Sequence, residues 1–277
     1  MNFTKRNDLF AGVDSDGPVF DSMRIKHTFS FIPTAVDVFG LEAYRAEFFK
    51  IAERINLYSL TRGVNRFPGL LLTFEELEET TAFNGFGDKS FKEYIESGYP
   101  FSNDGLGHYI SSHPSDFLNK VLEWSRTSDG IFKRLCEDIK PFEAVHKTLE
   151  HLRKYADTAV ISAASGGGLL ADWTNAGLDK SVDFIAGQEL GNKSEQLKFA
   201  AQNGYSKMLM IGDAPGDYDA AKSVGASFYP IIPGRENECW ELLDEKYADM
   251  FFENKYDEET ENELYGKFIG FLKGEQL

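Results

Sequence analysis

The strongest constraint on the fold is an alternation of short apolar runs with helix-length segments between residues 158 and 231. This pattern predicts strands at 158–162, 182–186, 207–212 and 226–231, and helices at about 168–176, 194–203 and 217–224. Strands that alternate with helices of this length form a parallel sheet with helical crossovers. We therefore predict an α/β fold with helices on both faces of a parallel sheet.

One more strand is expected near the start of the chain. The apolar run Leu9-Phe10-Ala11-Gly12-Val13 ends abruptly in Asp14-Ser15-Asp16-Gly17-Pro18, a pattern typical of a buried strand followed by a tight loop. Open α/β sheets bind ligands outside the carboxyl ends of their strands. Both aspartates are therefore expected at a ligand-binding edge.

Further polar residues lie at the ends of later strands. Ser162 directly follows the apolar run that ends at Ile161, and Lys193 opens a helix in the segment Gly191-Asn192-Lys193-Ser194-Glu195. The segment Gly212-Asp213-Ala214-Pro215-Gly216-Asp217 follows the strand predicted at 207–212. Each motif alone is common in turns and helix caps. Their order and their positions after strands point to one site.

Together these motifs resemble the haloacid dehalogenase superfamily of phosphatases, over residues 9–22 and 141–235. The resemblance implies a Rossmann-like core and an Asp14 nucleophile that forms an acyl phosphate. It makes Asp16 the general acid that protonates the leaving oxygen and then the base that activates water. Because a dehalogenase needs no such acid, Asp16 favours phosphoryl chemistry over carbon–halogen cleavage.

The resemblance also implies roles for the later motifs. Ser162 would bind the transferring phosphoryl group, and we prefer it to Ser165 because it follows the strand directly. Lys193 would offset the repulsion between the nucleophile and an incoming phosphate.

The acidic residues of the motifs are expected to hold a metal ion. Asp213 would ligate it and Asp217 would support the ligand shell, with Asp14 and Asp16 completing the cluster. Oxygen-only sites that face a phosphate suit Mg²⁺, which is the expected cofactor.

Pro18 departs from the family pattern, because family members often carry Thr at this position. The substitution removes a hydroxyl that can brace the loop, although the fixed φ of proline can stiffen the loop instead.

An insertion separates the first motif from the others. Residues 23–140 have a largely helical pattern, with Leu41, Tyr44, Phe48, Ile51 and Ile55 on one helix face and a second helix after Ser115. No regular structure is assigned to residues 81–113. By the family resemblance, residues 1–22 and 141–235 form the hydrolase core and 23–140 form a helical cap that determines substrate specificity. Residues 236–277 are expected to be an acidic C-terminal segment packed on the core.

The insertion contains a basic cluster in an otherwise acidic chain. Arg62, Asn65 and Arg66 are candidate contacts for anionic groups of the substrate. The alternative is that the arginines form salt bridges with Glu75, Glu76 or other acidic residues of the cap.

Composition narrows the choice of partners. A net charge of −16 opposes binding to nucleic acid or to an anionic membrane. Two cysteines without zinc-type spacing fit a reducing compartment, and no apolar stretch has the length of a signal peptide or a membrane span. We expect a cytoplasmic protein, and its oligomeric state, monomer or homo-oligomer, stays open.

The sequence thus predicts a Mg²⁺-dependent phosphatase that acts on a small phosphorylated metabolite. A phosphomutase of a sugar phosphate is the main alternative, because the same motifs make the same phospho-aspartate and only the acceptor differs. A catalytically silent binding protein on this fold is the third possibility, and the presence of both Asp14 and Asp16 argues against it.

Overall fold

The computed structural model describes residues 4–85, 87–137 and 139–275, and it divides into two compact units. The core unit contains the chain up to Ser22 together with the residues that follow Glu137. The cap unit runs from Met23 to Glu137, compared with the expected insertion at 23–140. The C-terminal segment is part of the core unit.

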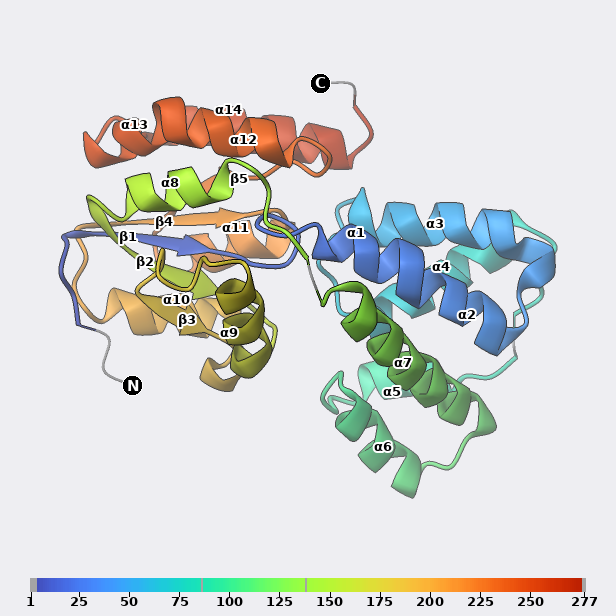
Figure 1. The fold of residues 1–277 in the computed structure, drawn as a ribbon. Coiled ribbons are helices and arrows are strands. Elements are labelled where there is room, and N and C mark those ends of the chain that lie inside the picture. Colours follow the sequence, from blue (N-terminus) through green and yellow to red (C-terminus); the bar gives the residue numbers. More distant parts are fainter. Residues whose placement is uncertain (1–3, 86, 138, 276–277) are drawn as a thin grey trace. The chain divides into compact units, whose positions relative to one another are not determined.

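The core unit is built on a parallel sheet whose strand order, among the described residues, is β3-β2-β1-β4-β5 (Figure 1). The strands are β1 Leu9–Val13, β2 Ala156–Ile161, β3 Phe184–Ala186, β4 Lys207–Gly212 and β5 Ser227–Pro230. In the centre, Val13 of β1 is in register with Val160 of β2 and with Ile211 of β4. The predicted α/β fold with a Rossmann-like parallel sheet is confirmed. The loop after β1 therefore lies between the loops after β2 and β4.

Helices pack on both faces of this sheet. They are α8 Val145–Leu152, α9 Gly166–Asn175, α10 Lys193–Ala201, α11 Pro215–Lys222, α12 Glu236–Leu242, α13 Ala248–Phe252 and α14 Glu258–Leu272. Successive strand residues point to opposite faces. Val13 packs in one buried cluster with Leu149 of α8 and Trp240 of α12, whereas Phe10 packs in another with Leu197 of α10. Figure 1 accordingly shows α8 and α12 on one side of the sheet and α10 on the other.

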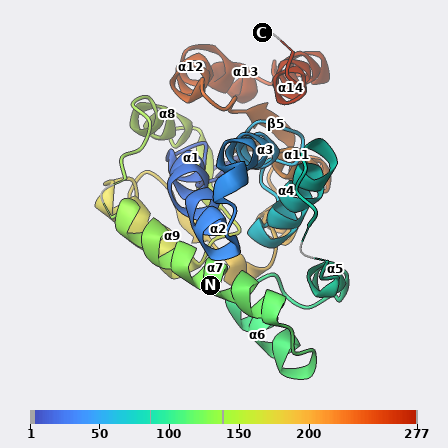
Figure 2. The same ribbon diagram turned by 90° about the vertical axis from the view of Figure 1, so that its right-hand side faces the viewer.

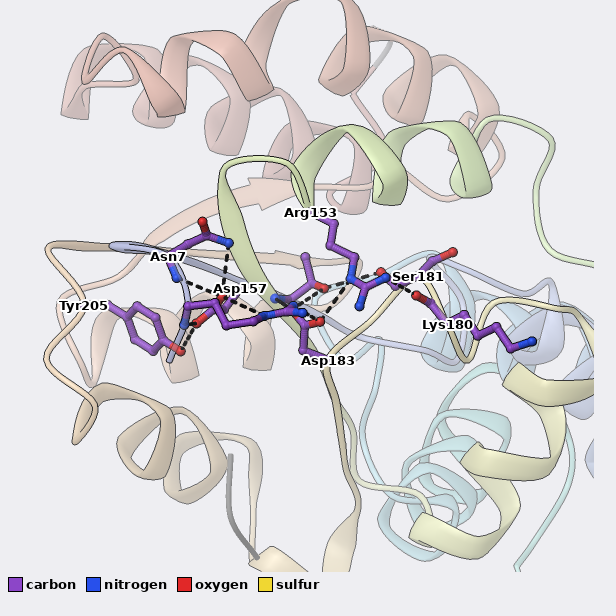
Figure 3. Close-up of polar contacts among 9 residues, drawn as sticks. Asn7, Arg153, Asp157, Lys180, Ser181, Asp183 and Tyr205 are labelled. Atoms are coloured by element: carbon purple, nitrogen blue, oxygen red, sulfur yellow. Dashed lines mark hydrogen bonds and ion pairs between the residues drawn. The ribbon is translucent and has the colours of Figure 1, made fainter. Parts of the chain in front are cut away.

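A polar network fastens the strands at the edge opposite the carboxyl ends (Figure 3). The fully buried Asp157 accepts hydrogen bonds from the backbone nitrogen of Arg6 at 2.8 Å and from the side chain of Asn7 at 3.1 Å. It also accepts one from the Tyr205 hydroxyl at 2.9 Å, and Arg6 forms a salt bridge with Asp183. These residues precede or begin β1, β2, β3 and β4, so the network fixes the relative positions of the strands that carry the motifs.

The cap unit is helical (Figure 2). It has its own apolar core. After α1 Ser22–Lys26 and a π-helical turn at His27–Phe31, its helices are α2 Ile32–Phe39, α3 Arg45–Leu57, α4 Arg66–Thr80, α5 Ser90–Glu96, α6 Asn103–Ser112 and α7 Asp116–Leu135. The π-helical turn and α2 pack against α7, and the Ser30 hydroxyl donates to the Ser128 carbonyl at 2.7 Å. The two ends of the insertion are thus adjacent within the cap unit. No described helix of the chain is both long and apolar enough to cross a lipid bilayer.

The structure departs from the sequence analysis of the cap in two places. The stretch 81–113, to which the sequence pattern assigns no regular structure, contains α5 and α6. Ser102 caps α6 by accepting a hydrogen bond from the backbone nitrogen of Gly105 at 3.0 Å. Leu41 and Tyr44 do not belong to the helix of Phe48, because a 3₁₀ turn at Glu42–Tyr44 precedes α3.

Candidate active site

Three buried carboxylates meet at the carboxyl edge of the sheet. Asp14 follows β1, Asp213 follows β4, and Asp217 lies in the first turn of α11. They are 4%, 2% and 0% exposed, and one carboxylate oxygen from each lies within 4.8 Å of the others. The backbone nitrogen of Asp14 donates to the Ile211 carbonyl at 2.9 Å, which extends the pairing of β1 with β4 to the site itself.

Lys193 joins two of these carboxylates. Its Nζ lies 2.8 Å from Asp14 Oδ2 and 2.5 Å from Asp217 Oδ1. Burial alone would lower the pKa of Lys193, but the negative charges of Asp14 and Asp217 outweigh burial and raise it. Lys193 is therefore a permanent cation at the site.

The site has more negative charge than Lys193 can balance. Burial raises the pKa of Asp14; Lys193 opposes this shift, and the neighbouring charges of Asp217 and Asp213 add to it. Three carboxylates facing one lysine leave a net charge of about −2 when all are ionised. Hard oxygen donors with this excess charge fit a divalent cation such as Mg²⁺.

Asp217 also shapes the loop before its own helix. Its Oδ2 accepts hydrogen bonds from the backbone nitrogens of Asp213 at 3.1 Å and Ala214 at 3.0 Å. Gly212 makes room for this carboxylate, because a Cβ at residue 212 would lie 2.4 Å from Asp217 Oδ2. The position of the Asp217 carboxylate therefore requires a glycine at residue 212.

The expectation that Asp16 completes the carboxylate cluster needs correction. Asp16 is partly exposed, and its carboxylate is not in the group formed by Asp14, Asp213 and Asp217. Its Oδ1 instead accepts a hydrogen bond from the Ser22 hydroxyl at 2.5 Å. Next to it, Gly17 has a φ of 104° and donates its backbone nitrogen to the Phe20 carbonyl at 2.9 Å, in a turn that places Asp16 in a bridge with Phe20. The proton-transfer role of Asp16 stays a prediction.

The two candidate serines occupy different positions. Ser162 is buried directly after β2, and its Oγ accepts from the backbone nitrogen of Ala164 at 3.2 Å. Ser165 is the N-cap of α9, where it accepts from the backbone nitrogen of Gly168 at 3.3 Å. Helix capping accounts for Ser165, so the phosphoryl-binding role stays a prediction for Ser162.

Two tryptophans brace the loop that carries Asp14. Trp173 of α9 donates from Nε1 to Ser15 Oγ at 2.9 Å, and Trp240 of α12 donates to the Pro18 carbonyl at 2.7 Å. Both indoles are fully buried. Pro18 has no hydroxyl that could stabilise this loop, and the hydrogen bonds from the two tryptophans stabilise it instead.

The polar candidates of the cap have structural partners. Asn65 caps α4 by accepting from the backbone nitrogen of Phe67 at 3.1 Å, and Arg66 pairs with Asp129 at 2.5 Å. Arg62 is 6% exposed and donates to the Leu57 carbonyl at 2.8 Å. For Arg66 the alternative of a salt bridge to a cap acid applies, with Asp129 as the partner.

Sequence reasoning missed Gln196, Trp173 and Trp240, which contact the residues or loops of the site. The available signal was weak: Gln196 is a polar residue on the helix face that also buries Leu197 and Ala200.

Comparison with known proteins yields structural neighbours only. No family model matches the chain, and no curated protein matches it. A haloacid dehalogenase family hydrolase from Deinococcus radiodurans, solved with bound phosphate and sodium, is similar at 19% identity with a TM-score of 0.48, covering 81% of each chain. A predicted phosphoglycolate phosphatase from Haemophilus somnus shares 16% identity with a TM-score of 0.47, covering 83% of this chain and 88% of that one.

An L-2-haloacid dehalogenase from Xanthobacter autotrophicus is also similar, at 13% identity and a TM-score of 0.41, covering 82% of this chain and 78% of that one. Two of these three neighbours carry the name of the family that the motifs resemble, and the three include one predicted phosphatase and one dehalogenase.

Proposed function

We propose that this chain is a hydrolase of the haloacid dehalogenase superfamily, specifically a Mg²⁺-dependent phosphatase of a small phosphorylated metabolite that forms an aspartyl phosphate on Asp14. The observation that carries the proposal is the contact of Lys193 with both Asp14 and Asp217 beside Asp213, at the carboxyl edge of the sheet. This arrangement supplies a nucleophile, a fixed cation and oxygen ligands within one buried site.

Asp14 and Asp213 would hold the metal ion, with Asp217 orienting the loop of Asp213. When bound, Mg²⁺ would neutralise charge on the phosphoryl oxygens. Lys193 would supply the second positive charge, and the Ser162 hydroxyl would donate a hydrogen bond to the phosphoryl group.

The reaction would take place in two displacements. In the first, a carboxylate oxygen of Asp14 attacks phosphorus, the bond from phosphorus to the ester oxygen breaks, and Asp16 donates its proton to that oxygen. In the second, Asp16 takes a proton from water, the water oxygen attacks phosphorus, and the bond to Asp14 breaks. The products are an alcohol and inorganic phosphate, and both aspartates return to their starting states.

Asp16 favours this reaction over carbon–halogen cleavage, in which the leaving halide needs no proton. Its carboxylate accepts a hydrogen bond from Ser22 and lies outside the metal-binding group, which supports a role as a proton carrier and not as a metal ligand. A phosphomutase would use the same residues, with a sugar hydroxyl in place of water.

The test is a screen of phosphorylated metabolites for phosphate release with Mg²⁺ and with excess chelator. We expect release only with Mg²⁺ and none from Asp14→Asn, since an amide is too poor a nucleophile. Asp16→Asn should still cleave an aryl phosphate slowly. Its rate on an alkyl phosphate, whose leaving oxygen needs a proton, should fall by about 10²–10⁴-fold. Full turnover in chelator, or equal losses on the two substrates, would contradict the mechanism.

Mass spectrometry after rapid quenching gives an independent readout. Phospho-enzyme on Asp14 should accumulate in Asp16→Asn, because water is no longer activated. Migration of phosphate within a sugar phosphate, without release, would instead identify a mutase. Halide release from a 2-haloacid, without any phosphatase activity, would identify a dehalogenase.

A further inference from the structure

Gln196 makes an unusual set of contacts with the segment that follows β2. It lies on α10, three residues after Lys193, and it is 1% exposed. Its Oε1 accepts from the backbone nitrogen of Ser162 at 3.0 Å, and its Nε2 donates to the carbonyl of the same residue at 2.8 Å. One side-chain amide thus binds both backbone groups of Ser162, whose nitrogen also donates to the Ala186 carbonyl of β3 at 3.2 Å.

The same amide also binds the loop that leads into α10. Its Nε2 lies 3.1 Å from the Gly187 carbonyl and 2.9 Å from the Gly191 carbonyl. Directly after this loop, Asn192 and Glu195 form a reciprocal capping box that starts the helix of Lys193. Gln196 therefore connects the end of β2, the loop after β3 and the start of α10.

No other common side chain can make these contacts. The oxygen must face a backbone N–H while the nitrogen faces three carbonyls, so the network fixes the orientation of the amide. A carboxylate would place negative charge against the three carbonyls. An apolar side chain would leave the buried Ser162 carbonyl without this donor, at a cost of roughly 1–3 kcal/mol for an unsatisfied group, whereas the Gly187 carbonyl would keep the Leu190 backbone nitrogen as a donor.

We propose that Gln196 is a positioning residue that fixes the Ser162 hydroxyl relative to the ammonium group of Lys193. The two groups would bind the phosphoryl group from the end of β2 and from the start of α10, and Gln196 connects these two segments. The inference rests on the proposed function, because it assigns Ser162 and Lys193 to phosphoryl binding.

The test compares Gln196→Met with Gln202→Met, an exposed glutamine at the end of the same helix. Gln196→Met should lower kcat/KM for the best phosphomonoester by about 100-fold, as small displacements of reacting groups do, whereas Gln202→Met should leave it unchanged. Gln196→Asn, which keeps the amide on a shorter side chain, is the second variant should Gln196→Met not fold.

A double-mutant cycle separates positioning from general damage. If Gln196 acts through Ser162, Gln196→Met should lower kcat/KM only slightly in a Ser162→Ala background. In an Asp16→Asn background it should lower kcat/KM by the full factor seen in the single variant. The same loss in both backgrounds would overturn the proposal, as would unchanged activity of the single variant.

Amide hydrogen exchange provides a readout that does not depend on activity. Gln196→Met should speed the exchange of the Ser162 amide and of residues 187–192, with no change in the cap, and Gln202→Met should not. Unchanged exchange in this segment would overturn the positioning role. Wild-type protein that releases no phosphate would contradict the proposed function, and the exchange result would still decide the role of Gln196.

Discussion

At the scale of single residues, the Asp217 carboxylate accepts several hydrogen bonds that few other side chains could accept together. One carboxylate receives hydrogen bonds from Lys193 and from the backbone of Asp213 and Ala214. An asparagine has one acceptor oxygen and would turn its N–H₂ group toward one of these donors. The full set of contacts can therefore be made only by a carboxylate.

We expect Asp217→Asn to reduce kcat/KM by about 100-fold and to raise the Mg²⁺ concentration needed for half-maximal activity, since the loop of Asp213 loses its anchor. Asp219→Asn is the matched control, because Asp219 lies on the same helix and is exposed. Mg²⁺ titrations of phosphate release check both. Equal behaviour of the two variants would show that Asp217 does not organise the site.

His27 provides a pH-dependent prediction for the cap. Burial, together with the nearby positive charges of Lys26, Arg62 and Arg66, lowers its pKa to about 3. The unfolded chain binds a proton at its ordinary pKa, about 6.5, whereas the folded cap does not. This proton therefore opposes folding below pH 6.5 and not above it, with a slope of about 1.4 kcal/mol per pH unit.

We expect His27→Gln to flatten the loss of unfolding free energy between pH 6.5 and pH 3, measured by denaturant titration at each pH. His108→Gln, at an exposed position of the cap, should leave the slope unchanged. A wild-type free energy that does not fall in this range would contradict the assignment of a buried neutral His27.

The site residues that could be predicted from the sequence are those that belong to short motifs with a recognisable residue type and spacing. Asp14, Lys193, Asp213 and Asp217 were found because each follows a strand in a recognisable order. Gln196 could not be found, because its importance depends on backbone groups that are distant in sequence. The direction of the Asp16 carboxylate was also hidden, because it follows from the turn at Gly17 and the hydrogen bond to Ser22.

At the scale of elements, the C-terminal helices support a loop at the other end of the chain. Trp240 of α12 donates to the Pro18 carbonyl, and its ring is buried beside Leu149 of α8. Sequence patterns predicted the strands well because apolar runs between polar loops are distinctive. They predicted α5 and α6 poorly because glycines and aromatic residues interrupt the helical period in 81–113.

We expect Trp240→Phe to lower the free energy of unfolding of the core by about 1–3 kcal/mol, because phenylalanine is still aromatic but is smaller and has no N–H to donate to the Pro18 carbonyl. It should also lower kcat, since that loop carries Asp14. Trp124→Phe is the control: it removes a similar hydrogen bond, to the Phe31 carbonyl within the cap. If Trp124→Phe reduced kcat as much as Trp240→Phe, support of the catalytic loop would not be the cause.

At the scale of the whole molecule, the apolar clusters of the described residues divide between the two units, with two in the core unit and one in the cap unit. The cap core includes Phe48, Phe67 and Trp124. The first and last helical segments of the insertion pack against one another within the cap unit. A unit with its own core and neighbouring termini has the features of an independently folding domain.

We expect residues 23–137, expressed alone, to unfold cooperatively on heating and to show helical circular dichroism. A non-cooperative melt with exposed apolar surface, detected by dye binding, would show that the cap depends on the core. The complementary core, with 23–137 replaced by a short linker, should lose discrimination among phosphomonoesters if the cap confers specificity. Unchanged selectivity would assign recognition to the core.

The central position of β1 has a consequence for synthesis of the chain. Its partners β2 and β4 begin at Ala156 and Lys207. The apolar strand β1 is therefore synthesised first and stays unpaired until both partners have been synthesised. At roughly 5–20 residues per second, the ribosome needs on the order of ten seconds or more to supply them. The cap can fold during this delay while β1 remains unpaired. Chaperone demand during translation should therefore depend more on the length of the insertion than on the stability of the finished core.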